Sequence, residues 1–127
     1  MPTLLLVDDN AVVRDVLRLH AENRGLEVVG EAQDGPEGVE LAERLAPDAI
    51  VLDQEMPTMT GLKALRSIRR RAPDVVVVMY CSDASIRQSA FTAGARAFFT
   101  KGDSPRDVVM SVLGLLAESR STEGSAK

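Results

Sequence analysis

The chain has 127 residues, of which 45% are hydrophobic and 27% are charged, a balance typical of one globular domain. A single cysteine excludes an internal disulfide framework and any zinc site built on paired thiolates. The net charge of −4 argues against binding to nucleic acid, and no apolar stretch approaches the roughly 20 residues that cross a bilayer. We therefore expect one cytoplasmic domain that makes no direct contact with nucleic acid or with a membrane.

Segments typical of strands and helices alternate along the chain. A strand is predicted over 3–7, followed by a helix whose apolar residues recur every three or four positions and which closes at Gly25. A strand over 27–30 precedes a helix that begins at Gly35, with proline in its first turn, and stops before Pro47.

The second half of the chain repeats this alternation. The predicted elements are a strand over 49–52, a helix over about 61–72, a strand over 75–80, a helix over about 85–93, a strand over 96–99 and a helix that opens at Ser104-Pro105. Two of these strands, over 49–52 and 75–80, are apolar almost throughout, as expected for strands covered on both faces.

Five strand–helix units predict an α/β fold with a five-stranded parallel sheet and helices on both faces. Right-handed crossovers leave few topologies for such a sheet, and the flavodoxin-like (βα)5 order 2-1-3-4-5 is the leading one. We expect the domain to occupy residues 1–118 and the polar residues 119–127 to form a flexible tail. No residues remain for a second domain.

Acidic residues follow two of the predicted strands directly. Asp8 and Asp9 follow the first strand, and Asp53 follows the third. In the expected order these strands are neighbours at the point where strand order reverses, which is where open parallel sheets bind ligands. Three carboxylates there repel one another and raise the pKa of at least one, and Mg²⁺ would remove this conflict. The alternatives are that the first two acids only cap a helix and that the third lies in a turn.

These residues resemble the receiver domain of bacterial two-component response regulators, in its stand-alone, chemotaxis-regulator-like form, over residues 3 to about 117. An Asp-Asp pair alone is weak support, but the pair, the Asp-x-x-Met-Pro-x-x-x-Gly run and a late lysine in register are specific. The matching segments are Leu5-Leu6-Val7-Asp8-Asp9-Asn10, Ile50-Val51-Leu52-Asp53-Gln54-Glu55-Met56-Pro57, Thr58-Met59-Thr60-Gly61, Ala93-Gly94-Ala95 and Phe98-Phe99-Thr100-Lys101.

The resemblance implies that Asp53 accepts a phosphoryl group from a histidine kinase or phosphotransfer protein. It implies that Asp8, Asp9, Asp53 and the backbone carbonyl of Glu55 bind Mg²⁺, and that Lys101 pairs with a phosphoryl oxygen. The phosphorylated state would change contacts with a downstream protein target or a separate output domain. Because the Asp53 carboxylate is expected to be ionised already, no general base is needed. The chain would then be no enzyme beyond its own phosphoryl uptake and loss.

Two positions depart from the family pattern. The family has a serine or threonine hydroxyl at the end of the fourth strand, where counting from Asp53 places Cys81. Counting back from Gly94 falls about two residues short, so the intervening loop is contracted. Because a thiol donates weakly, we expect Ser82 to supply the hydroxyl, with Cys81 as the alternative or as a plain core thiol. The switch aromatic corresponds to Phe98, which lacks a hydroxyl and is otherwise a core residue.

Basic residues on the predicted helices have two interpretations. The resemblance makes Arg14 and Arg18 candidates for contact with a kinase, and the alternative is that they are ordinary exposed arginines. On the third predicted helix, a solvated face is expected for Arg66, Arg69, Arg70 and Arg71.

Three other functions compete with phosphoryl acceptance. A phosphohydrolase with an aspartate nucleophile lacks its expected second acid here, and 127 residues leave little room for a substrate cap. A mononucleotide binder needs a Gly- or Ser/Thr-rich phosphate loop, whereas this loop is acidic. A degenerate receiver that acts by protein contact without phosphorylation is disfavoured by the retained acids.

Overall fold

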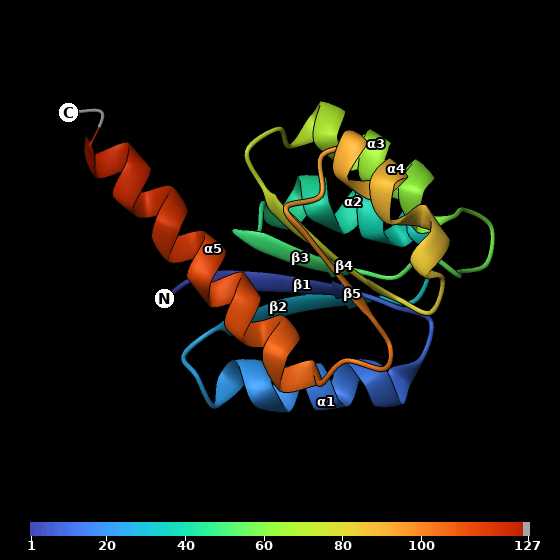
Figure 1. Cartoon of the computed structure of the whole chain (residues 1–127), viewed down its shortest axis with the longest axis horizontal. Helices are drawn as coiled ribbons and strands as arrows, with labels where there is room; N and C mark the ends of the chain where they lie inside the picture. The colour runs from blue at the N-terminus through green and yellow to red at the C-terminus, as the bar shows by residue number, and fades with distance from the viewer. Residues whose placement is uncertain (126–127) are drawn as a thin grey trace.

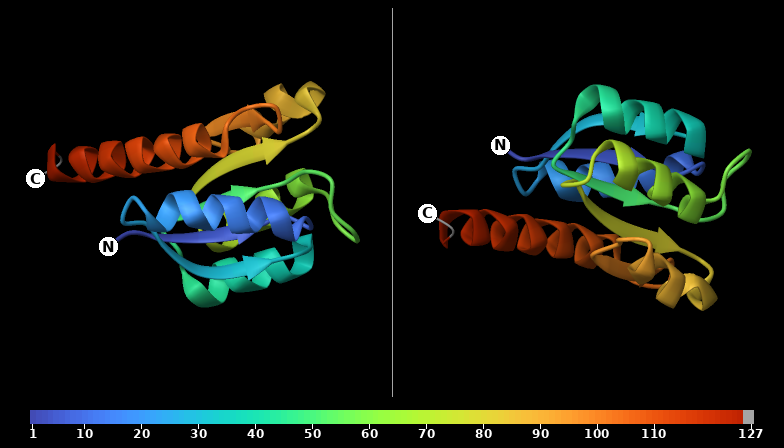
Figure 2. Two further views of the ribbon diagram at one scale, coloured as in Figure 1. Left: turned by 90° about the horizontal axis from the view of Figure 1, so that it is seen from below. Right: turned by 90° about the horizontal axis from the view of Figure 1, so that it is seen from above.

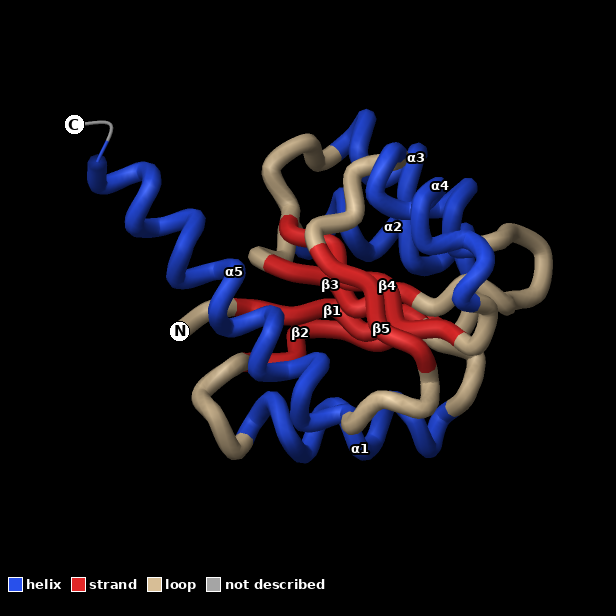
Figure 3. Tube along the Cα trace, in the orientation of Figure 1, coloured by secondary structure: helices blue, strands red, loops and turns tan. Residues whose placement is uncertain are grey.

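The computed structural model describes residues 1–125, with side chains described up to Ser119. Five parallel strands form one sheet in the order β2-β1-β3-β4-β5, as predicted (Figures 1 and 3). The strands are β1 (Thr3–Val7), β2 (Glu27–Ala32), β3 (Ala49–Leu52), β4 (Val76–Cys81) and β5 (Ala97–Thr100). The helices are α1 (Ala11–Glu22), α2 (Gly35–Leu45), α3 (Gly61–Arg71), α4 (Arg87–Thr92) and α5 (Pro105–Ser125).

The sheet separates two hydrophobic clusters, one on each face. Alternate residues of β1 show the division, because Leu4 and Leu6 pack on the face covered by α1 and α5, whereas Leu5 and Val7 pack on the face covered by α2, α3 and α4. Every residue of β3 and β4 is buried, as their apolar composition predicted. The burial of both faces therefore fixes the register of the central strands, since a slip of one residue would exchange the two faces.

Two helices differ from their predicted bounds. The loop before α4 contains a 3₁₀ turn over Ala84–Ile86, capped by the side chain of Asp83, so that α4 itself has only six residues. Helix α5 continues through Ser125, although residues 119–125 were expected to belong to a flexible tail (Figure 2). A helix that is already nucleated extends readily through polar residues. Residues 126 and 127 lie outside the described part of the chain. Within residues 1–125, no helix is long and apolar enough to cross a membrane.

The prediction that all four arginines of α3 lie on a solvated face is wrong for Arg69. Arg69 turns inward, where its Nη1 donates to the carbonyls of Pro73 and Val75, each at 2.8 Å, and its Nη2 donates to the carbonyl of Gly94 at 2.9 Å. The side chain therefore ties the end of α3 to the start of β4 and to the loop before β5. These carbonyl oxygens provide acceptors for both terminal nitrogens of the guanidinium group, which allows the side chain to turn inward.

The start of α3 lies directly against the end of β3. The Gly61 N–H donates to the carbonyl of Gln54 at 3.0 Å, and a Cβ built on Gly61 would lie 2.0 Å from the carbonyl oxygen of Asp53. No side chain fits this contact without moving the backbone, since the obstacle is main chain. Glycine at this position therefore sets where the Asp53 backbone lies relative to α3.

We expect Gly61→Ala to lower the free energy of unfolding by about 3 kcal/mol, because the new methyl group overpacks a backbone contact. Gly114→Ala is the control, since Gly114 lies inside α5 with nothing within 4 Å of its Cβ position. That control should raise stability by about 0.5–1 kcal/mol through helix propensity. Urea denaturation measures both, and equal stability of Gly61→Ala and the wild type would contradict the close approach.

Candidate functional site

The carboxyl ends of β1 and β3 carry the acidic residues to one point. The Asp8 N–H donates to the carbonyl of Ala32 at 3.0 Å, and the Asp53 N–H donates to the carbonyl of Val7 at 2.9 Å. Both acids thus continue the strand ladder by one residue, and both are buried, with 3% of each residue exposed. Asp9 is exposed, and one carboxylate oxygen from each of the three acids lies within 4.8 Å of the others. The convergence predicted from the strand order is confirmed.

Lys101 is the cation that faces these acids. It follows β5, and its N–H donates to the carbonyl of Cys81 at 2.9 Å, which holds the loop against the end of β4. Its Nζ lies 2.9 Å from Oδ2 of Asp8, 3.8 Å from Oδ1 of Asp53 and 5.4 Å from the centre of the Tyr80 ring. Among the side chains described up to residue 119, Lys101 is paired with two of the three carboxylates, so that the acids of the cluster outnumber the cation paired with them.

The protonation of Asp53 reflects this excess. Burial away from water and the charge of Asp8 raise the pKa of Asp53 from 3.8 to about 7, although Lys101 and the Gln54 N–H, at 2.8 Å from Oδ1, act in the opposite direction. The raised pKa expected for at least one of the three acids is therefore found at Asp53, whose carboxyl lies close to its pKa at neutral pH when no cation is bound. Burial lowers the pKa of Lys101, but Asp8 and Asp53 raise it overall, so that this side chain remains charged.

The acids are available to bind a cation, since none of them caps α1. The side chain of Asn10 accepts from the N–H groups of Val12 and Val13 and serves as the cap. The Asp9 carboxylate has no hydrogen bond or ion pair with any side chain in the described range up to residue 119. Three converging carboxylate oxygens, one of them unpartnered, fit a hard divalent cation that prefers oxygen ligands. Helix capping alone does not explain the three acids.

The remaining predicted site residues lie in the loop after β3, at the end of β4 and in β5. Glu55 is exposed in the β3–α3 loop, and its charge contributes to the raised pKa of Asp53. Cys81 is fully buried at the end of β4, its Sγ donates to the carbonyl of Asp83 at 3.7 Å, and burial raises its pKa to about 11. Ser82 is exposed. Phe98 packs in the core on the face covered by α2, α3 and α4, opposite Met79 of β4. The roles of these residues stay predictions.

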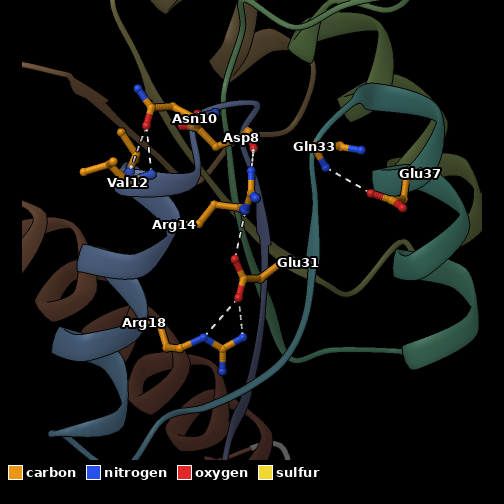
Figure 4. Close-up of polar contacts among 9 residues, drawn as sticks. Asp8, Asn10, Val12, Arg14, Arg18, Glu31, Gln33 and Glu37 are labelled. Carbon is orange, nitrogen blue, oxygen red and sulfur yellow. Dashed lines mark hydrogen bonds and ion pairs between the residues drawn. The ribbon is translucent and has the colours of Figure 1, made fainter.

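Sequence reasoning missed a network of ion pairs behind the acidic loop. Arg14 and Arg18, which the sequence left either as candidates for contact with a kinase or as ordinary exposed arginines, both pair with Glu31 of β2 (Figure 4). Arg14 also donates to the backbone carbonyl of Asp8. The available signal was Glu31 itself, because a charged residue near the end of a strand that is partly buried needs a partner of opposite charge.

A second omission was Tyr80. Its ring lies beneath the Lys101 ammonium group, and its hydroxyl donates to the carbonyl of Asp103 at 2.8 Å. The side chain thus contacts both Lys101 and the loop that follows it. Nothing in the sequence distinguished this tyrosine from an ordinary core residue.

Comparison with known proteins places this arrangement in a family. The sequence model of the response regulator receiver domain matches residues 4–113. The chain belongs to the response regulator receiver family. It is 37% identical over 123 residues to the response regulator GacA of Pseudomonas aeruginosa, which covers 94% of this chain and 58% of GacA. This receiver domain thus spans just over half the length of that curated relative.

Solved structures agree with the family assignment. The response regulator domain of Thermotoga maritima CheB superimposes with a TM-score of 0.82 at 36% identity, over 93% of this chain and 95% of that chain. A CheY-like receiver domain protein from Methanospirillum hungatei gives a TM-score of 0.88 at 26% identity, over 96% and 98%. The receiver fold inferred from the strand order is therefore confirmed.

The raised pKa of Asp53 makes stability depend on pH. Because the folded pKa of about 7 lies above the ordinary value of 3.8, the protonated form stabilises the fold, and this stabilisation is lost as pH rises through 7. Without divalent cations, Asp53→Asn should raise the free energy of unfolding by roughly 2–3 kcal/mol more at about pH 8.5 than at about pH 5, because about two pH units of the loss lie between pH 5 and the folded pKa.

Denaturation with a chelator present measures this difference, and Asp15→Asn is the control because Asp15 is an exposed acid on α1. A gain for Asp53→Asn of equal size at both pH values would contradict a buried carboxyl with a raised pKa.

Proposed function

We propose that this receiver domain accepts a phosphoryl group on Asp53 from the phosphohistidine of a histidine kinase or phosphotransfer protein. The observation that carries the proposal is the burial of Asp53 between the acids of β1 and the ammonium group of Lys101. Phosphoryl transfer needs positioning and neutralisation of charge more than covalent assistance from the protein. The site offers a carboxylate nucleophile, a cation on one side and oxygen ligands for a metal on the other.

In the proposed step, a carboxylate oxygen of Asp53 attacks phosphorus while the bond between phosphorus and the histidine nitrogen breaks. Bound Mg²⁺ would neutralise charge on the phosphoryl oxygens. Asp8, Asp9, Asp53 and the backbone carbonyl of Glu55 would hold it. Lys101, which lies between Asp8 and Asp53, turns its ammonium group to a phosphoryl oxygen as the negative charge of Asp53 is spread over the new group. A cation also keeps Asp53 ionised at neutral pH.

We place the contact with the phosphodonor protein on α1. It begins at Ala11, two residues after Asp9, and it exposes an apolar stripe at helical spacing, with Val12 69% and Leu19 60% exposed and Val16 between them. Apolar residues on one helix face favour a protein partner over solvent. Arg14 and Arg18 form ion pairs with Glu31, so that they contribute less positive charge to this surface than the sequence suggested.

The phosphorylated state would change protein contacts near β5. Lys101 follows this strand and Phe98 lies within it, so a shift of the lysine toward a phosphoryl group pulls on the segment that carries the aromatic ring. The recipient is a downstream protein target or a separate output domain. In this proposal the chain works in the cytoplasm, touches neither nucleic acid nor membrane, and catalyses only its own phosphoryl uptake and loss. No phosphohydrolase or nucleotide-binding function is needed to explain the site.

Incubation with acetyl phosphate and Mg²⁺ should add one phosphoryl group to the wild type and none to Asp53→Asn. Asp9→Asn should need a higher Mg²⁺ concentration for the same rate, because a site with few ligands loses an anionic oxygen. Glu40→Gln, which alters an exposed acid of α2, serves as the control. Intact mass spectrometry measures the labelling, and equal labelling of wild type and Asp53→Asn would refute the assignment in favour of a receiver that acts without phosphorylation at this residue.

The hydroxyl position is tested by comparing Ser82→Ala with Cys81→Ala. We expect Ser82→Ala to weaken the conformational response more, because the Cys81 thiol is a weak donor that already contacts the carbonyl of Asp83. A charge-assisted hydrogen bond from Ser82 would contribute roughly 1.5–3 kcal/mol to the phosphorylated state. Amide NMR spectra with and without beryllofluoride, a phosphoryl mimic, give the response. A loss confined to Cys81→Ala would assign the position to the cysteine.

A further inference from the structure

The three carboxylates of the site differ in how they are held. Asp8 pairs with Lys101 and accepts from the Asn10 N–H at 2.9 Å, and Asp53 accepts from the Gln54 N–H at 2.8 Å. The carboxylate of Asp9 has no such contact with any side chain up to residue 119. The direction of the Asp9 side chain therefore depends on the conformation of the backbone at Asp8 and Asp9.

Arg14 holds this backbone from the side of α1. Its Nη1 donates to the carbonyl oxygen of Asp8, which belongs to the peptide plane joining Asp8 to Asp9. Because a peptide unit is planar, fixing this carbonyl also fixes the amide nitrogen of Asp9 and restricts the direction in which its side chain leaves the strand. The hydrogen bond from the Asn10 N–H to the Asp8 carboxylate closes the segment on its other side.

Glu31 in turn holds Arg14. Its Oε1 accepts from Nε of Arg14 at 2.8 Å, and its Oε2 accepts from Nε of Arg18 at 3.0 Å and from Nη2 of the same residue (Figure 4). The Arg14 side chain is 16% exposed and that of Glu31 is 26% exposed, so the pair is largely sheltered from solvent. Burial raises the pKa of Glu31, but the hydrogen bonds from Arg18 and Arg14 lower it overall, and the carboxylate stays ionised.

We propose that Arg14, held by Glu31, is a positioning residue that orients the Asp8–Asp9 peptide so that the Asp9 carboxylate faces the cation site. The inference rests on the proposed function of that site. Coulomb's law alone gives the opposite effect, because a guanidinium group beside a cation site repels the incoming cation. A favourable contribution of Arg14 to cation binding therefore arises from geometry, as when outer groups orient the ligands of a metal.

The two arginines of α1 offer a matched comparison. Arg14→Met and Arg18→Met each remove one positive charge and one ion-pair partner of Glu31, and Arg18→Met also removes the pair with Glu22, but only Arg14 touches the Asp8 carbonyl. We expect Arg14→Met to weaken Mg²⁺ binding about 10-fold, the usual order for loss of an outer group, and Arg18→Met to stay within about twofold of wild type. Calorimetric titration with Mg²⁺ gives the affinities, and thermal unfolding of each variant shows whether it folds.

Three outcomes would overturn the inference. Tighter Mg²⁺ binding by Arg14→Met would show that its charge dominates, and equal losses in both variants would show a general link between α1 and β2. Full affinity in Arg14→Lys would also refute it, because lysine keeps the charge but lacks the fork that reaches both Glu31 and the carbonyl. If Arg14→Met does not fold, Glu31→Gln releases Arg14 with a smaller change and should also weaken binding.

A measurement without metal separates this inference from the proposed function. Hydrogen exchange of the Asn10 amide, which donates to Asp8, should be about 10-fold faster in Arg14→Met than in Arg18→Met if the loop loosens. Equal exchange would refute the positioning role even where Mg²⁺ binds. Failure of wild type to bind Mg²⁺ or to be labelled on Asp53 would instead refute the proposed function and leave the exchange result standing.

Discussion

The repulsion among three carboxylates at the carboxyl edge of the sheet governs the rest of this structure. Two of them, Asp8 and Asp53, are almost fully buried, and the ammonium group of Lys101 lies against both. Buried acids that share one counter-ion are costly for a folded chain, and the pKa of about 7 for Asp53 is the sign of that cost. The buried acids thus lower the stability of the cation-free fold, and the same acids create the negative charge that favours binding of a cation.

The fold maintains this arrangement through the backbone more than through side-chain pairs. The ladder between β1, β2 and β3 continues one residue into Asp8 and Asp53, which fixes where both side chains leave the sheet. The close contact between Gly61 and the Asp53 carbonyl fixes the backbone of Asp53 against the start of α3. The hydroxyl of Tyr80 holds the loop that follows Lys101. Rigid strands and short contacts thus hold like charges together, a geometry that flexible loops alone would relax.

Much of this organisation could be predicted from the sequence. Strand order followed from the alternation of apolar and helical segments, and the convergence of the acids followed from strand order. What could not be predicted depends on long-range packing. Glu31 reaches Arg14 across 17 residues, and Arg69 turns inward to carbonyls that only the fold brings together. The sequence predicted a raised pKa for at least one of the three acids, but the size of the shift at Asp53 depends on burial, which the order of residues does not give.

A titration of the wild-type chain with Mg²⁺, followed by amide NMR, tests the central claim most directly. If the carboxylate cluster is a cation site, saturable shifts will concentrate at the amides of Asp8, Asp9 and Asp53 and near Lys101, with one ion bound per chain. Shifts that do not saturate, or that spread over exposed acids such as Glu40 and Glu43, would contradict the account. In that case the burial of Asp8 and Asp53 would have no connection with cation binding.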